Sequence, residues 1–292
     1  MTNIQKHLEA HFSRMGDQPI SKLLPYAGLI TVVTCVVIFM FRFYLIEPFA
    51  RKYYRERYTC LDEVQRRSFI NHHVAGSIKI FLVIFAAYPF IAVMSGSKTL
   101  HSPVSHHSKV TVGDLLLITD EVFCAMYIFE LFYRTQVSYI SAAHHIGAMV
   151  IAQSATVLAL DPEHRADANI EFVLCLLWGF FDVVAEFWPH LAIIVYRLCP
   201  SDHRKLQRIF FLSLCMELAG TTVETITVMA IFGSLWSRWT LAFKVITPIL
   251  HVLFSLAQLW GARVFWNMYL HQKKLARNAE LEKTNSKGSS NV

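Results

Sequence analysis

The sequence has 292 residues, of which 54% are hydrophobic and only 16% are charged, and its mean hydropathy is +0.40. This is too apolar for an ordinary soluble domain, so the composition predicts a multi-pass membrane protein. The formal net charge of +6 is carried by segments between apolar runs. We therefore interpret it as a topology signal and expect no nucleic-acid partner.

Apolar runs of about twenty residues predict an all-α bundle of about seven transmembrane helices. Residues 1–22 form a polar N-terminal tail without the features of a removable signal peptide, residues 23–270 form the helical domain, and residues 271–292 form a basic, polar and disordered tail. The predicted crossings, in chain order, are Leu23–Ile46, Val74–Met94, Val112–Tyr133, Val137–Leu160, Ile170–Leu198, Ile209–Phe232 and Leu241–Leu270.

The Lys and Arg residues between these runs are distributed unequally. Sixteen lie on the side of the first, third and fifth connectors and the C-terminal tail, and seven lie on the opposite side. Because cytoplasmic loops are enriched in Lys and Arg, the C-terminus is predicted to be cytosolic and the N-terminus lumenal.

The most informative stretch is the fourth run, which carries His144 and His145 well inside an apolar segment. Ionisable groups at membrane depth are costly and often mark function, although two histidines can also hydrogen-bond neighbouring helices for structure alone. Small residues accompany the pair, namely Ser141, Gly147, Ala148 and Ala152. Since small residues allow helices to approach closely, this helix is predicted to lie at the centre of the bundle.

Further polar residues recur at helical spacing in the other runs. Asp182, Glu186 and His190 form one stripe in the fifth run, and their Asp182/Glu186 face is expected to point at the histidine pair. The other polar residues are Glu130, which can pair with Arg134, Glu217 and Glu224 in the sixth run, and Lys244, His251 and Gln258 in the seventh.

Each of these groups has two interpretations. In the first interpretation, the groups form a buried hydrogen-bond network that specifies helix packing. This interpretation is preferred for Glu130–Arg134 and for Lys244. The other is a polar cavity open to the cytosol, because several of the groups fall at a similar predicted depth. The expected cavity-lining residues are Glu130, Glu217, His251 and Gln258. Such a cavity suits an amphiphile, with its headgroup near the histidines and its tail among apolar side chains.

Three segments together resemble the TLC (TRAM/Lag/CLN) domain of endoplasmic-reticulum membrane proteins. They are Tyr127-Ile-Phe-Glu-Leu-Phe-Tyr-Arg134, Ser141-Ala-Ala-His-His145 and Gly179-Phe-Phe-Asp-Val-Val-Ala-Glu186, and the resemblance covers about Arg66–Lys273. The family includes ceramide synthases, which N-acylate sphingoid bases from acyl-CoA, and proteins of lipid regulation and cargo handling. Trp178-Gly179 stand where ceramide synthases carry His-Asp, so the resemblance implies a divergent member.

The sequence leaves three classes of function open. In a lipid N-acyltransferase, His144 or His145 would be the base or nucleophile, and Asp182 or Glu186 would orient it. A non-enzymatic lipid-binding, lipid-transport or cargo-handling protein could use the same cavity. A seven-helix receptor or ion-coupled transporter is less favoured because the sequence shows neither a receptor signature nor paired broken helices.

The remaining expectations concern ligands and location. The six cysteines have no metal-ligand or redox spacing, so no metal site is expected. No bound cofactor is expected, and acyl-CoA is the co-substrate of the enzyme hypothesis. The predicted partners are the lipid bilayer and a lipid or acyl-CoA ligand. A homodimer is the one oligomeric assembly that the hypothesis includes. The predicted location is the endoplasmic-reticulum membrane.

Overall fold

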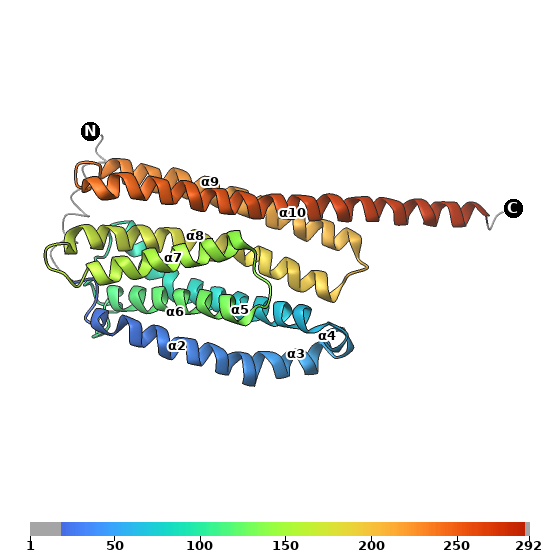
Figure 1. Ribbon diagram of the computed structural model, residues 1–292, viewed down its shortest axis with the longest axis horizontal. Helices are drawn as coiled ribbons and strands as arrows, with labels where there is room; N and C mark the ends of the chain where they lie inside the picture. Colours follow the sequence, from blue (N-terminus) through green and yellow to red (C-terminus); the bar gives the residue numbers. More distant parts are fainter. Residues whose placement is uncertain (1–18, 290–292) are drawn as a thin grey trace.

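The computed structural model describes residues 19–289, with side chains for residues 19–282. The described chain is helical and contains no β-strand, only an isolated bridge between Pro103 and Thr111. Long helices run back and forth beside one another, and α10 extends far beyond the rest (Figure 1). The elements are η1 (Leu24–Tyr26), α2 (Ala27–Phe41), the π-helical turn η2 (Arg42–Ile46), α3 (Glu47–Tyr54), α4 (Glu56–Thr59), α5 (Glu63–Met94), α6 (Val112–Tyr133), α7 (Tyr139–Leu158), α8 (Arg165–Leu198), α9 (His203–Ser234) and α10 (Leu241–Ser289).

Helix starts follow polar caps rather than the edges of the apolar runs. The Asp62 side chain accepts a hydrogen bond from the Gln65 backbone N–H, so α5 begins well before the predicted run. Asp202 caps α9 in the same way. At the start of α6, Thr111 and Asp114 form a reciprocal capping box. An apolar window therefore finds these helices but misses the polar first turns of α5 and α9.

Four of the described helical segments are long and apolar enough to cross a membrane: Leu24–Tyr54, Glu63–Met94, His203–Ser234 and Leu241–Glu282. Helices α6, α7 and α8 are not among them. The all-helical class and the presence of candidate membrane spans are confirmed, whereas the count of seven crossings stays a prediction.

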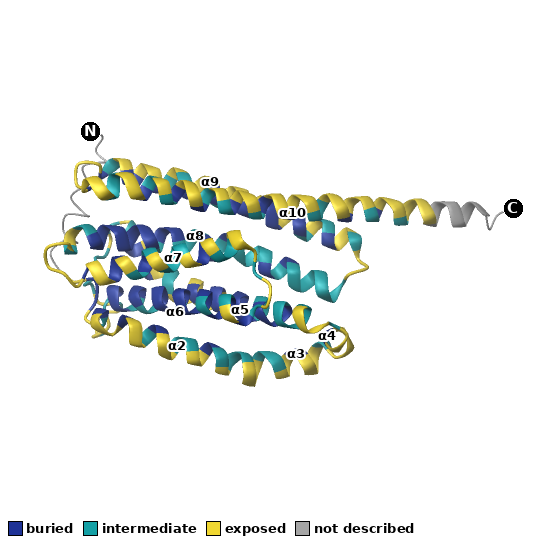
Figure 2. Ribbon diagram, in the orientation of Figure 1, coloured by how far each residue is buried: buried dark blue, intermediate teal, exposed yellow. Residues whose placement is uncertain are grey.

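The buried core is formed mainly by α5, α6 and α8 (Figure 2). Helix α8 packs against α5, α7 and α9, while α2 lies along α6 and α10 lies along α9. The outer helices expose large apolar side chains, including Val32, Val36 and Met40 on α2. Exposed apolar surface of this extent marks a site of contact with a membrane or with another protein. A membrane-facing surface agrees with the apolar composition of the sequence.

Helix α7 does not lie at the centre of the bundle, contrary to the prediction from its small residues. Tyr139, Ile146, Val150 and Val157 on its outer face are each at least half exposed. The small residues serve a one-sided contact instead. A Cβ added at Gly147 would lie 3.3 Å from the ring of Phe254 on α10, so the close approach is real but occurs on one face only.

The predicted disorder of the C-terminal tail is wrong where the structure describes that tail. Helix α10 continues to Ser289, so residues 271–289 are helical and not disordered. Polar contacts with the start of α9 explain this continuation, because His203 Nδ1 lies 2.8 Å from Gln272 Oε1 and Arg204 donates to Glu280. Residues 1–18 and 290–292 lie outside the described residues. Ser21, in the predicted N-terminal tail, is buried and donates a hydrogen bond of 2.6 Å to Asp114.

Candidate functional site at the histidine pair

The two histidines lie in the first half of α7, and their side chains turn into the bundle. The Ser138 hydroxyl accepts a hydrogen bond from the Ser141 backbone N–H and caps the helix a turn and a half before the pair. His144 and His145 are only 8% and 6% exposed. Adjacent positions on a helix differ by about 100°, so the two rings meet different neighbours.

His144 faces the acidic stripe of α8, as the sequence predicted. Its Nε2 lies 3.3 Å from Asp182 Oδ2 and 3.7 Å from Glu186 Oε1. Asp182 is held by two further donors, the Tyr127 hydroxyl at 3.2 Å and Gln258 Nε2 at 3.1 Å. Donors from α6 and α10 therefore fix the carboxylate that orients His144.

Lys79 on α5 is a site residue that the sequence analysis did not single out. Its ammonium donates to Glu186 Oε2 at 2.7 Å and to the backbone carbonyl of Asp182 at 3.3 Å, and its side chain is only 1% exposed. A lone lysine inside an apolar run was the signal available, because such a residue seldom stays buried without a partner.

Three donor atoms of this group also have a geometry that could hold a cation. One atom each from His144, Asp182 and Glu186 lies within 4.8 Å of the others, a donor set that the cysteine count did not anticipate. The Lys79 ammonium already bonds one of these carboxylates. The chain thus supplies a positive charge of its own at this position.

His145 pairs with a different carboxylate, Glu130 on α6. Its Nε2 lies 3.0 Å from Glu130 Oε2, and its ring stacks on Tyr127 with centroids 4.0 Å apart. Asn71 Nδ2 on α5 donates to the other oxygen of Glu130 at 2.6 Å. Glu130 therefore does not pair with Arg134, although the two are spaced i, i+4.

The two histidines share one cavity of about 430 Å³, which Asp182 does not border. Among the predicted lining residues, Glu130, Glu217 and Gln258 border it, as do both histidines and Glu186. His251 does not border it; it accepts a hydrogen bond from Trp178 Nε1 at 3.2 Å in the packing between α8 and α10. His190, the last member of the acidic stripe, borders the cavity and contacts His72.

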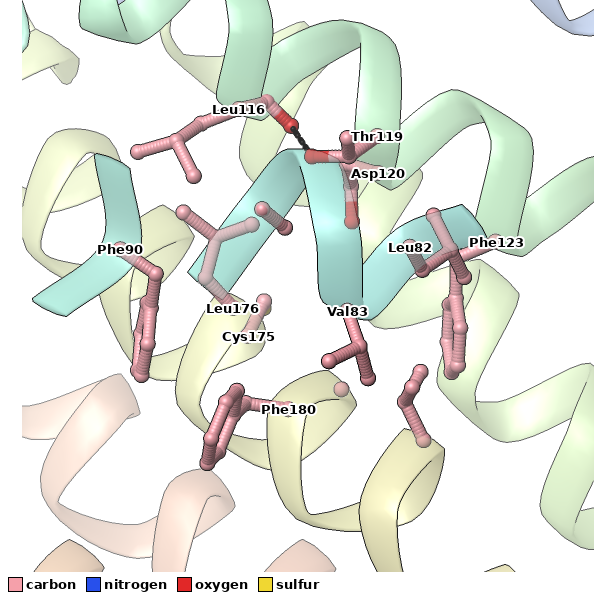
Figure 3. A pocket seen from close by; sticks show the side chains of 13 residues that line it. Leu82, Val83, Phe90, Leu116, Thr119, Asp120, Phe123, Cys175, Leu176 and Phe180 are labelled. Atoms are coloured by element: carbon pink, nitrogen blue, oxygen red, sulfur yellow. Dashed lines mark hydrogen bonds between the residues drawn. The ribbon is translucent and has the colours of Figure 1, made fainter. Parts of the chain in front are cut away.

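A second, much smaller void lies beside His144. This void of about 20 Å³ shares His144 and Gln258 with the cavity, and shares Asp120 and Gly179 with a groove of about 50 Å³. Figure 3 shows this groove between α5, α6 and α8, with aromatic and aliphatic side chains around it and Asp120 in its wall. The polar cavity and the apolar groove therefore lie on either side of this void, which His144, Asp120 and Gly179 line.

Comparison of the chain with family models, with curated proteins and with solved structures finds no match.

Proposed function

We propose that this chain is a TLC-like protein of the endoplasmic-reticulum membrane with seven crossings, which acts in lipid metabolism of the sphingolipid type. Its cavity binds an amphiphilic substrate from the cytosolic side, and His144 assists acyl transfer from acyl-CoA to an amine or hydroxyl group of that substrate. One observation carries the proposal: two buried histidines, each beside a carboxylate, border a single cavity of about 430 Å³ with those carboxylates, Glu186 and Glu130. Polar side chains of α6, α7 and α8, among them Glu130, His145 and Glu186, face this interior, which supports membrane crossing by helices that carry ionisable groups.

The proposed role of His144 follows from its contacts. His144 Nε2 lies 3.3 Å from Asp182 Oδ2, so in the neutral tautomer that places the ring proton on Nε2, toward Asp182, Nδ1 carries the free lone pair. Nδ1 accepts the proton of the acceptor group while the acceptor nitrogen or oxygen forms a bond to the thioester carbonyl carbon. The carbon–sulfur bond breaks, and the thiolate that leaves takes the proton from the imidazolium. Asp182 and Glu186 stabilise the positive charge that His144 carries between these steps.

A lipid-binding protein without catalysis is the second candidate, and a specific observation favours it. The Nδ1 atoms of His144 and His145 are buried, and neither has a hydrogen-bond partner among the described side chains. A substrate reaches these atoms only if it displaces neighbouring side chains. A protein that merely holds or moves a lipid would use the same cavity without that displacement.

The experiment is an acyl-transfer assay on membranes that contain the full-length protein. Radiolabelled long-chain acyl-CoA is supplied with a sphingoid base, a simple amine or a lysolipid, and label in the lipid product is measured. We expect His144→Ala to abolish transfer, while the control His203→Ala, at the start of α9 and outside the cavity lining, retains it. Label trapped on the protein itself would make His144 a nucleophile. Wild-type membranes that transfer no label to any acceptor, yet retain bound lipid after purification, would leave the binding protein as the better account.

A further inference from the structure

Two arginines border the cavity with no ionic partner. Arg134 ends α6, and Arg197 lies in the last turn of α8. Within the side chains of residues 19–282, neither guanidinium forms an ion pair or a hydrogen bond, and the Nε atom of each is buried. Among the described side chains, Arg197 makes a cation–π contact with the ring of its neighbour Tyr196, at 5.5 Å from the ring centroid. Two positive charges in one partly buried cavity, without a counter-ion, call for an anionic ligand.

Other arginines of the chain show what a structural role looks like here. Arg42, Arg67 and Arg204 each reach a carboxylate, provided by Glu47, Glu63 and Glu280 respectively. Arg134 had such a partner available one helical turn away in Glu130, but that carboxylate is taken by His145 and Asn71. The fold thus leaves these two guanidiniums free.

The cavity is electrostatically divided along its length. Glu186 lies eleven residues before Arg197 on α8, which is about 16 Å along the helix axis, and its carboxylate is bonded by Lys79. Glu217 borders the cavity from α9, fourteen residues after that helix begins, or about 21 Å along it. Glu186 and Glu217 therefore lie deep in the cavity, and the arginines lie at the end where α6 and α8 stop. Glu130, one turn before Arg134, also borders the cavity, but it is paired with His145 and bonded by Asn71.

We propose that Arg134 and Arg197 bind a phosphate group of the cavity's ligand. Arginine presents paired N–H donors that match phosphate oxygens, and the hydroxyls of Ser68 and Ser141 border the same cavity. The phosphate belongs either to the diphosphate of a coenzyme A thioester or to the headgroup of a phospholipid. This inference deepens the proposed function, because it assigns one end of that substrate cavity to a chemical group.

The length of the cavity distinguishes the two sources. A phosphate at Arg197 lies about 16 Å along α8 from the turn that carries Glu186. A ligand that reaches His144 from there needs an extended arm between its phosphate and its reacting group. A coenzyme A thioester has such an arm, whereas the phosphate of a phospholipid lies close to its acyl esters. The geometry thus favours the thioester.

The test is a binding measurement on the full-length protein, purified in a phosphate-free maltoside detergent. Binding of free coenzyme A and of lysophosphatidate is measured by isothermal titration, with inorganic pyrophosphate as competitor. We expect Arg134→Gln and Arg197→Gln each to weaken binding about tenfold, corresponding to the loss of one charge-assisted hydrogen bond. Lysine at the same position should restore part of the affinity. Arg208→Gln, an exposed arginine of α9 outside this cavity, is the matched control and should bind as the wild type does.

The outcomes separate this inference from the proposed function. Arginine-dependent binding of coenzyme A supports the thioester, and arginine-dependent binding of lysophosphatidate alone supports a phosphate-bearing lipid. The inference is overturned if the wild type binds neither probe, or if both Gln variants bind like the control while their melting temperatures fall, because the arginines would then only stabilise helix ends. Arginine-dependent binding without acyl transfer refutes the enzyme alone. Acyl transfer with an unchanged KM in both variants refutes the phosphate site alone.

Discussion

The two histidines should be energetically coupled to different acids, and this pairing can be tested by substitution. His145 and Glu130 are in contact at 3.0 Å, with side chains 7% and 4% exposed. His144 instead contacts Asp182 at 3.3 Å. We predict that His145→Ala and Glu130→Gln interact strongly in their effects on stability, whereas His144→Ala and Glu130→Gln are nearly additive.

The magnitude follows from burial. Removing one partner of a buried ion pair leaves the other charge uncompensated, which costs about 3–5 kcal/mol. Glu130 keeps the hydrogen bond from Asn71, so His145→Ala should fall near the lower end, at about 3 kcal/mol. The double variant removes both partners, and its cost should be smaller than the sum of the single costs by about 0.5–3 kcal/mol.

The measurement is equilibrium unfolding in detergent micelles, followed by circular dichroism, for the wild type, the single variants and the two double variants. The cross pair His144/Glu130 is the internal control, and its double variant should match the sum within about 0.5 kcal/mol. Additive effects in the His145/Glu130 cycle, or equal coupling in both cycles, would refute the assignment of one acid to each histidine.

Three further outcomes are expected. Lys79→Met should destabilise the protein by about 3 kcal/mol because Glu186 loses its ion pair, and adding Glu186→Gln should recover part of this loss in the same unfolding assay; a double variant as unstable as the sum would contradict the pair. Gly220→Ala should cost about 1–3 kcal/mol through overpacking, since its Cβ would lie 2.8 Å from the Cβ of Ala185, whereas Gly233→Ala, which meets open space, should be tolerated; equal melting temperatures would refute the close contact of α8 and α9. In intact microsomes, added protease should remove a C-terminal tag, and a protected tag would refute the predicted topology.

Much of the architecture follows from local patterns in the sequence. In a lipid environment the backbone N–H and C=O groups of a long apolar run must form hydrogen bonds within the protein, and a helix provides these bonds within the run itself. Each predicted run therefore coincides with a helical segment. The i, i+4 spacing of Asp182 and Glu186 places both carboxylates on one face of α8 for the same local reason. The convergence of this face with His144 was also predictable, because buried polar groups at similar depth need partners that their own helices do not supply.

The tertiary structure alone decided which partner each group takes. His144 and His145 are neighbours in the chain, yet one meets α8 and the other meets α6, because about 100° of rotation separates them. The i, i+4 pattern equally allowed Glu130 to bond Arg134, but the position of α7 beside α6 brought His145 closer to that carboxylate. Partner choice depends on the rotation and axial shift of one helix against another. These quantities arise from packing across the whole bundle, and no single helix sequence encodes them.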